Sequence, residues 1–477
     1  MKKNEYYNHI HPLSLTKKLK LSALFLLLPI IQQILYRPTG IAEIIGSMSL
    51  NALYSAFVTT FAIMSYRRCL YRIAPNGIKI CSGIINRKRL LLPFDRIQTM
   101  IFHEDILSRL FNAAWVYFDT AGGRKNSADI SVCLNRKTAY AVRKLIASKK
   151  TEKIRCSILN MLLMAAFWSN PVSGLLFSVP VVYHLKTIFG LAPNDLLSSV
   201  DTPIRHILPN ISPAAEMLAK IMIIGWLVSF VVQFFKYANF TCCREGKYIV
   251  TSRGLASRTL ICTKADGITA VTIDHTLIMH LFRLKSASVF TIGSGKLKGD
   301  KSLIIPAEKE AALCRRLEEI VPMNTAELKT VSPKKGSVLS YLYAPLIAAA
   351  VYIFAAYFFF SFGEFAAQLR AAAAVAAIPI IWWIIFRVYA FKTSFIRICD
   401  NCAAINSYDR LTMRKFYIPF DKLQYITIKQ NPFQKRKGCC NITIYMYYEK
   451  TVKRTVRQLP FREATELAQL IRSHMRK

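Results

Sequence analysis

Residues 71–123 read YRIAPNGIKICSGIINRKRLLLPFDRIQTMIFHEDILSRLFNAAWVYFDTAGG, and this stretch decides the fold. Asn76-Gly77 is a turn signal because both residues tolerate a positive φ. Ile78-Lys79-Ile80 beyond it alternates apolar and polar side chains, as a half-buried strand does. Val116-Tyr117-Phe118 is rich in β-branched and aromatic residues, which favours a later strand of the same kind. The stretch therefore predicts a small β domain.

The same unit occurs twice more along the chain. When Asp95 is aligned with Asp266, the copies coincide without a gap: Leu107, Phe111 and Gly122 fall on Ile278, Phe282 and Gly293. The third copy repeats Pro93-Phe94-Asp95 as Pro419-Phe420-Asp421. The shared Asp recurs after 171 and then 155 residues, and we interpret it as a strand-entry residue rather than an acid or base. Three copies of one module are predicted.

Each copy contains further strand-like segments and closes with an amphipathic one. The later strands are expected at 116–118, 289–292 and 442–446, and the closing helices at 137–148, 307–320 and 462–474. In the closing segments the apolar residues recur on one helical face. Each module is therefore predicted to be several short strands capped by a terminal helix.

A pair of apolar runs precedes each copy. The runs are 21–36 with 41–66, 156–185 with 217–235, and 338–362 with 371–386. A helix that crosses a bilayer needs roughly 17 to 25 residues, so we predict six transmembrane helices in three pairs. The run at Leu21 lacks a small-residue cleavage site and a second span follows it at once, so no cleaved signal peptide is expected.

Composition and charge agree with a membrane protein. The chain has 477 residues, is 53% hydrophobic and has a mean hydropathy of +0.29, which excludes a single soluble domain. Its net charge of +38 lies entirely in residues 1–20, 67–155, 236–337 and 387–477, which carry +4, +13, +8 and +13. Basic segments stay on the cytoplasmic side of a membrane, so the three modules and both termini are expected in the cytoplasm. None of the 12 cysteines falls in a predicted outer loop, and no disulfide framework is expected.

Together these features carry a resemblance to a known family. The chain resembles the YdbS/YdbT-type bacterial membrane proteins with PH-like domains. The resemblance rests on two spans, a Tyr-x-Ile start, a basic hairpin, a Pro-Phe-Asp-x-Ile-Gln segment, an apolar Leu-x-x-x-Phe and a strand ending in Thr-Ala-Gly-Gly. The three-copy, six-span organisation is similar to the longer, YdbT-type members. The third copy departs from the pattern, because Lys437 replaces the aromatic Phe111 and no Gly-Gly follows the strand.

The resemblance implies an α+β membrane protein in which each helix pair is followed by a seven-stranded PH-like β-barrel with a C-terminal helix. The expected order is a tail and first helix pair (1–66), a PH-like domain (67–150), a second pair (156–235), a second domain (236–322), a third pair (338–386) and a third domain (387–477). The resemblance also implies a link to cell-envelope stress or resistance to membrane-active peptides. It further suggests a protein partner, a shorter paralogue with one PH-like domain.

Two basic clusters are candidate contacts for anionic lipids. They are Arg87, Lys88 and Arg89 in the first hairpin, and Lys435, Arg436 and Lys437 in the third copy. Each cation near an anionic membrane surface contributes about 1 kcal/mol. The alternative is that domains tethered beneath a membrane are basic because topology requires it. Nucleic acid is not expected as a partner, because the charges are divided among islands and no recognition helix stands out.

No catalytic, cofactor or metal site is expected. Cys399 and Cys402 form the one CxxC, and Cys439-Cys440 could in principle complete a zinc site, but adjacent cysteines in a strand point to opposite faces. Residues 293–296, Gly-Ser-Gly-Lys, lack the full phosphate-loop spacing and align with a hairpin turn. The histidines are scattered, and ionisable residues are nearly absent from the spans, which argues against an ion-coupled carrier.

Two functions follow from this organisation. The first is a scaffold or sensor whose barrels recruit a partner or one another while the helices hold a membrane component. The second is a non-coupled transporter or lipid-handling protein, with a path lined by the helix pairs. We expect the first, and we expect no enzymatic activity.

Overall fold

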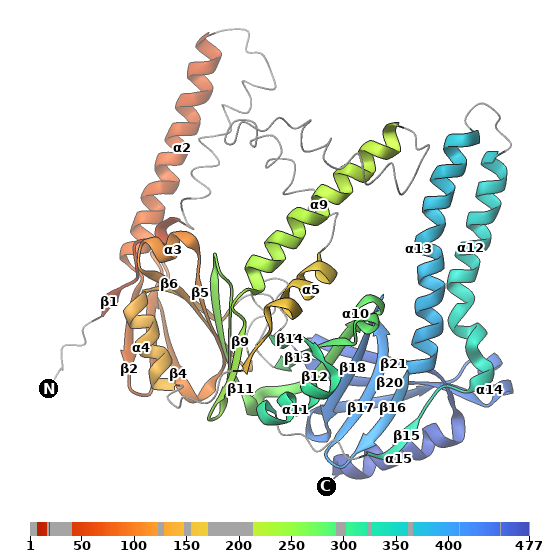
Figure 1. Cartoon of the computed structure of the whole chain (residues 1–477). Helices are drawn as coiled ribbons and strands as arrows, with labels where there is room; N and C mark the ends of the chain where they lie inside the picture. Colours follow the sequence, from red (N-terminus) through yellow and green to blue (C-terminus); the bar gives the residue numbers. More distant parts are fainter. Residues whose placement is uncertain are drawn as a thin grey trace.

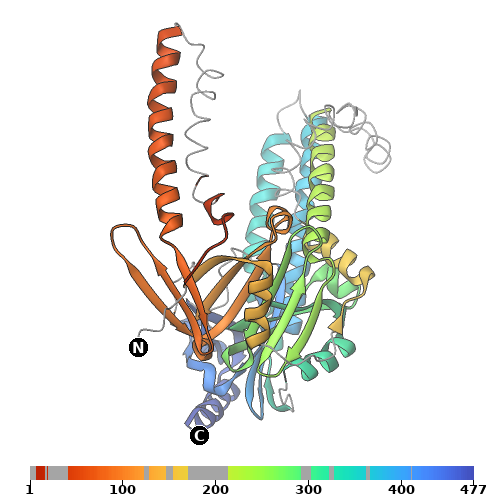
Figure 2. The ribbon, with the colours of Figure 1, turned by 90° about the vertical axis from the view of Figure 1, so that its left-hand side faces the viewer.

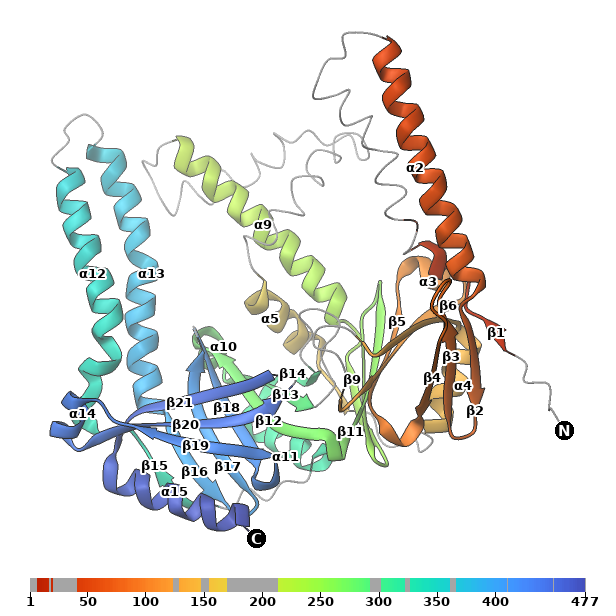
Figure 3. The ribbon, with the colours of Figure 1, turned by 180° about the vertical axis from the view of Figure 1, so that it is seen from behind.

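The computed structural model describes residues 7–16, 19, 41–122, 128–146, 154–169, 213–291, 302–321, 327–360, 366–409, 411–448 and 450–476. It is an α+β protein whose sheets are all antiparallel. The sheets form a row of three units, and the long helices extend from one side of this row (Figures 1 and 3).

Each unit contributes seven strands within the described residues. The first unit contains β1 (Asn8–His9), β2 (Leu70–Ala74), β3 (Gly77–Ser82), β4 (Lys88–Pro93), β5 (Ile97–Glu104), β6 (Ala113–Thr120) and β7 (Ile130–Asn135). The second contains β8 (Ile154–Arg155), β9 (Thr241–Glu245), β10 (Tyr248–Arg253), β11 (Arg258–Lys264), β12 (Ile268–Thr276), β13 (Leu284–Thr291) and β14 (Ser302–Lys309). The third contains β15 (Glu327–Val331), β16 (Phe395–Cys399), β17 (Cys402–Asp409), β18 (Thr412–Pro419), β19 (Leu423–Lys429), β20 (Cys439–Tyr448) and β21 (Lys450–Pro460).

Each unit closes with the predicted amphipathic helix. The three are α4 (Arg136–Ile146), α11 (Glu310–Ile320) and α15 (Phe461–Arg476). The predicted start of the second helix, at 307, was too early, because residues 307–309 belong to β14, where Glu308 and Lys309 pair with β13. Leu313, Leu317 and Ile320 of α11 are buried, which is the apolar face that the sequence pattern predicted.

The recurrent Asp lies at a corner between two sheets. Asp95, Asp266 and Asp421 are the middle residues of the 3-10 turns η1 (Phe94–Arg96), η2 (Ala265–Gly267) and η5 (Phe420–Lys422). Each turn passes directly into the next strand, so the residue does stand at a strand entry. The turn redirects the chain from the first sheet of a unit to its second sheet.

The units are joined by shared sheets. The strand orders are β7-β6-β5-β11-β10-β9-β8 and β14-β13-β12-β18-β17-β16-β15, so the second sheet of one unit continues into the first sheet of the next. Because a unit's two sheets meet at its corner, each shared sheet contributes to two cores. In β18, Phe416 and Ile418 pack in the core of the third unit, whereas Tyr417 packs in the core of the second.

A short helix and a left-handed residue recur in every unit. The helices are α3 (Ile106–Leu110), α10 (Leu277–Leu281) and α14 (Pro432–Lys437). Asn112, Arg283 and Gly438 follow them with φ of 50°, 54° and 63°. These residues are separated by the same 171 and 155 positions as the recurrent Asp, so the alignment of the copies holds beyond the corner.

Two helices in the described residues are long and apolar enough to cross a membrane. They lie at Lys220–Tyr237, within α9 (Pro213–Tyr237), and at Lys335–Phe358, which includes η3 (Lys335–Ser337) and most of α12 (Val338–Phe360). Two further long helices, α2 (Ile41–Arg67) and α13 (Ala366–Thr393), extend from the same side of the row (Figure 1). The expected run at 21–36 lies outside the described residues. Of the run at 156–185 the structure describes only the part through Ser169, with α5 at Ile158–Trp168.

The first strand of each unit precedes the helices, which the sequence did not reveal. β15 comes before α12 and pairs with β16, which follows α13. β1 and β8 pair in the same way with β2 and β9. The chain therefore leaves and re-enters each unit on neighbouring strands of one sheet, so α12 and α13 begin and end at the same side of the third unit.

Candidate membrane-facing surface

The short helices present apolar side chains to solvent on the side of the units that bears the long helices. Leu110 of α3, Leu281 of α10 and Phe433 of α14 are 73%, 79% and 77% exposed. In Figures 1 and 3, α3 lies beside the foot of α2 and α14 beside the foot of α12, while α10 lies at the helix-bearing end of the second unit. The apolar Leu-x-x-x-Phe of the first copy thus forms an exposed tip rather than part of a core. Apolar residues gathered on a short helix are suited to insertion at a membrane interface.

A basic groove lies at the foot of α2. Its volume is about 530 Å3, and all the charged residues that line it within the described chain are basic: Arg67, Arg68, Arg87, Lys88 and Arg89. Nη1 of Arg68 donates a hydrogen bond of 2.7 Å to the carbonyl of Ile84, which holds the β3–β4 hairpin against the end of the helix. The groove therefore joins the hairpin residues that the sequence singled out to two arginines that it did not.

The two arginines had a signal in the sequence. Arg67 and Arg68 directly follow the apolar run 41–66, and basic residues at the cytoplasmic end of a span lie near lipid head groups. Only the folded chain shows that the hairpin, which comes later in the sequence, returns to the same place. Five cations around an open groove favour an anionic ligand.

The second predicted cluster has a different setting. Lys435, Arg436 and Lys437 are exposed and form the last turn of α14, which a capping box of Asn431 and Gln434 begins and Gly438 ends. Cations in the last turn of a helix also interact favourably with the helix dipole. Nζ of Lys334 donates to the carbonyl of Lys437 at 3.0 Å, which links the cluster to the segment that leads into α12. The two basic clusters are therefore not equivalent positions of the repeated unit.

The four cysteines considered above for a zinc site belong to the cores. Cys399 and Cys402 pack in the core of the second unit, and Cys439 and Cys440 are buried. Burial raises the pKa of Cys402 and of Cys262 to about 12, so both remain protonated thiols at neutral pH. Within the described residues, no group of three or more His, Cys, Asp or Glu side chains is placed to hold a metal ion.

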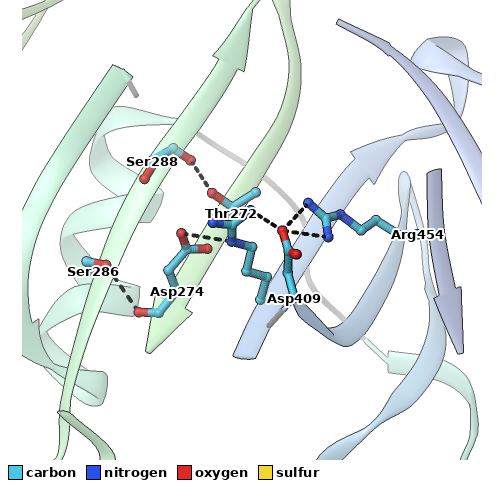
Figure 4. Close-up of polar contacts among 7 residues, drawn as sticks. Thr272, Asp274, Ser286, Ser288, Asp409 and Arg454 are labelled. Carbon is cyan, nitrogen blue, oxygen red and sulfur yellow. Dashed lines mark hydrogen bonds and ion pairs between the residues drawn. The ribbon is translucent and has the colours of Figure 1, made fainter. Parts of the chain in front are cut away.

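The junction of the second and third units contains a partly buried charge network, in which the Asp274 side chain is buried and that of Asp409 is 39% exposed (Figure 4). Nε of Arg414 on β18 lies 3.4 Å from Oδ2 of Asp274 on β12, and Nη1 of Arg414 lies 2.9 Å from Oδ2 of Asp409. Arg454 on β21 approaches the same Asp409 oxygen at 3.3 Å. In the neighbouring strand β13, the hydroxyl of Ser286 donates to the carbonyl of Asp274 at 3.1 Å. Paired buried charges of this kind fix which strands meet and in what register.

The long apolar helices, the exposed tips and the basic groove lie together on one side of a row of β units, which defines a membrane protein with attached PH-like domains. The chain belongs to the family described as bPH_2, bacterial PH domain, which matches residues 23–150, 188–319 and 344–475. The prediction of three PH-like units is confirmed by this match.

One curated relative supports the same conclusion. The chain is similar to the UPF0699 transmembrane protein YdbT of Bacillus subtilis (strain 168), with 22% identity over 329 residues. The alignment covers 63% of this chain and 66% of that relative, so the chain spans just under two thirds of the relative's length. No solved structure matches the chain.

Proposed function

We propose that the protein is a scaffold or sensor of the bacterial cytoplasmic membrane, with six helices in three pairs and with the PH-like units and both termini in the cytoplasm. The observation that carries the proposal is the fusion of the three units through shared sheets. Such a row holds several helix pairs at fixed spacing and presents one long surface beneath the membrane. The four basic islands face the cytoplasm in this arrangement. No catalytic step is assigned to the chain.

The basic groove supplies the lipid contact in this proposal. Arg67 and Arg68 come from the end of a membrane helix, so an anionic head group in the inner leaflet lies within their reach. Arg87 and Arg89 approach from the hairpin, and the exposed apolar tips of α3 provide an adjacent contact with the interface. At about 1 kcal/mol for each cation, loss of two arginines should weaken binding by roughly thirtyfold.

The lipid contact can be tested on the full-length protein in mild detergent. Short-chain phosphatidylglycerol and phosphatidylcholine are titrated against the wild type and the R67Q/R68Q variant. We expect preference for phosphatidylglycerol in the wild type and its loss in the variant. The matched control is K137Q/K144Q, which removes as much charge from two exposed lysines of α4. Equal loss in both variants would mean that the lipid responds to general basicity rather than to the groove.

The scaffold role is separated from transport by reconstitution. Purified protein in liposomes should give no flux of lipid or peptide between leaflets, and co-purification from native membranes should recover a protein partner. Partner-independent flux would support the transporter and overturn the scaffold. We further propose, from the family resemblance, that the role lies in cell-envelope stress, so a strain without the protein should be more sensitive to membrane-active peptides.

A further inference from the structure

At each end of the row, one strand is exposed whose equivalents inside the row join neighbouring units. β11 pairs with β5, and β18 pairs with β12, to form the shared sheets. β4 occupies in the first unit the place of β11 and β18, and β19 occupies in the third unit the place of β5 and β12. Within the described chain, β4 and β19 each end a sheet and have no strand on their outer side. In Figure 2 the β3–β4 hairpin, in orange-red, stands at the margin of the molecule.

Exposure confirms that these edges lack the cover that the internal strands have. Cys262 and Tyr417 are 0% and 7% exposed, whereas Leu91, at the same position of β4, is 59% exposed. On the other edge, Ala270 of β12 is fully buried, whereas Tyr425, at the same position of β19, is 48% exposed. Unpaired strand edges with exposed apolar side chains are templates for the addition of another strand.

Both internal junctions use one register. Cys262 lies opposite Met100, and Tyr417 lies opposite Val271. Counted from the recurrent Asp of their own units, Cys262 and Tyr417 are both four residues before it, and Met100 and Val271 are both five residues after it. The same register at a third junction would place Leu91 of β4 opposite the residue that corresponds to Ile426 of β19.

Charge decides which strand the β4 edge accepts. Near the end of each junction a basic residue lies opposite an acidic one: Arg258 opposite Glu104, and Arg414 opposite Asp274 at 3.4 Å. In the first unit, Arg87 corresponds to Arg258 and Lys88 corresponds to Arg414, so the β4 edge has a basic side chain at both positions. The strand that fits must therefore carry an acidic residue there.

The chain's own free strand does not meet this requirement. In a head-to-tail contact between two copies, Lys88 would lie opposite Lys429 of β19, and both are exposed. Like charges directly opposite each other destabilise a strand pair. A heterologous contact of this kind would also continue from copy to copy. The two lysines therefore act against polymerisation of the chain.

We propose that the β4 edge binds a PH-like domain of a different chain, through the first strand of that domain's second sheet, with an acidic residue opposite Lys88. The inference rests on the proposed scaffold function and names its partner class. The contact repeats the two junctions inside the chain, and it adds a unit at the end of the row, where the partner's own membrane helices can extend to the same side.

A charge swap tests the edge without an unknown ligand. The probe is the K88E/K429E double variant of the full chain. The wild type alone and the variant alone should each remain monomeric in detergent, because residues 88 and 429 of two identical molecules carry like charges. A mixture with wild type should associate, because each lysine of the wild type then faces a carboxylate that the substitutions place in the variant. Light scattering of the mixture should show at least a doubling of the protein mass.

The control carries the same change of charge elsewhere. K137E/K435E alters two exposed lysines on α4 and α14, and it should not associate with wild type. A disulfide should form in the mixture when one protein carries L91C and the other carries I426C. The pair L91C and T427C should cross-link less, because adjacent residues of a strand face opposite sides of the sheet. Absence of association in the charge-swap mixture would overturn the docking edge, and self-association of the wild type would make a second copy the occupant.

The identity of the partner requires native membranes. A photo-reactive residue at Leu91 should capture a chain that contains a PH-like domain with an acidic residue at the position opposite Lys88. Capture of this same chain, of a protein without such a domain, or of no protein would overturn the assignment. The R67Q variant separates this result from the proposed lipid contact, since Arg67 lines the groove but lies on α2 and not on β4, so the capture should persist in it.

Discussion

The strands β18 and β4 occupy the same place in the third and first units, yet one is interior and the other is an edge. Phe416 of β18 is fully buried, whereas Leu90, its counterpart in β4, is 47% exposed. The two strands are formed by the same local pattern, a basic stretch leading to Pro-Phe-Asp. The difference arises from the neighbouring unit, because β12 covers β18 and no described strand covers β4. Position in the row therefore determines what a given repeat residue contributes.

The largest effect is expected from truncation of the two corresponding residues, Phe416 and Leu90. Phe416→Ala should cost about 3–5 kcal/mol of unfolding free energy, because it removes a large aromatic side chain from a closed core. Leu90→Ala should cost less than about 1 kcal/mol, since much of the side chain is already in water. Thermal unfolding of the full-length protein in detergent measures both. Equal losses would show that the β4 edge is covered in the protein as it exists in solution.

The buried charge network should give the next largest effect. Asp274→Asn removes the buried acidic partner of Arg414 and leaves it, within the described residues, with the partly exposed Asp409; removal of one partner from a buried ion pair costs about 3 kcal/mol. Lys88→Ala, at the position of Arg414 in the first unit, should change stability by less than about 0.5 kcal/mol. The comparison fails if both substitutions are tolerated equally in the same unfolding assay.

These contrasts also mark what the sequence could predict. The three copies, their strands near 116–118, 289–292 and 442–446, and their closing helices followed from local periodicity, because one buried face imposes a repeat of two or 3.6 residues. The sharing of sheets between units had no such signal. Strand pairing between β5 and β11 joins residues that lie in different copies, far apart along the chain, and nothing in either strand alone identifies its neighbour.

The candidate site was only partly visible for the same reason. The hairpin cations Arg87, Lys88 and Arg89 formed a run that could be read directly. Arg67 and Arg68 were counted only as part of a basic island, since their proximity to the hairpin depends on the fold. The strands β1, β8 and β15 were also missed. Two are only two residues long, and all three precede the helices instead of adjoining the domains that they complete.

The interior of the row should also respond to acid. His275 on β12 bonds through Nε2 to the hydroxyl of Tyr389 at 2.8 Å, and burial, with Lys285 and His280 nearby, lowers its pKa to about 4. Glu310 and Asp274 oppose this shift. Between pH 6.5 and pH 4 the unfolded chain binds a proton that the folded chain does not, so stability present above pH 6.5 is lost as the pH falls.

Between about pH 7.5 and pH 5 this loss should be about 2 kcal/mol. His275→Asn keeps a neutral polar side chain and should flatten the pH dependence of unfolding over that interval. An unaltered pH profile in the His275 variant would place the acid sensitivity in other groups.

The smallest effect is one of access, with no change in folding energy. Cys81 lies on β3 beside the open edge and is partly exposed, whereas Cys262, on the strand that corresponds to β4, is fully buried by the first unit and its pKa is raised to about 12. A thiol reagent requires both access and the thiolate, so Cys81 should be alkylated in the native protein and Cys262 only after unfolding. Mass spectrometry of labelled peptides distinguishes the two. Cys81 lies opposite Arg89 of β4 in the hairpin. Binding of a partner strand at β4 should therefore slow the labelling of Cys81 and leave Cys262 as unreactive as before.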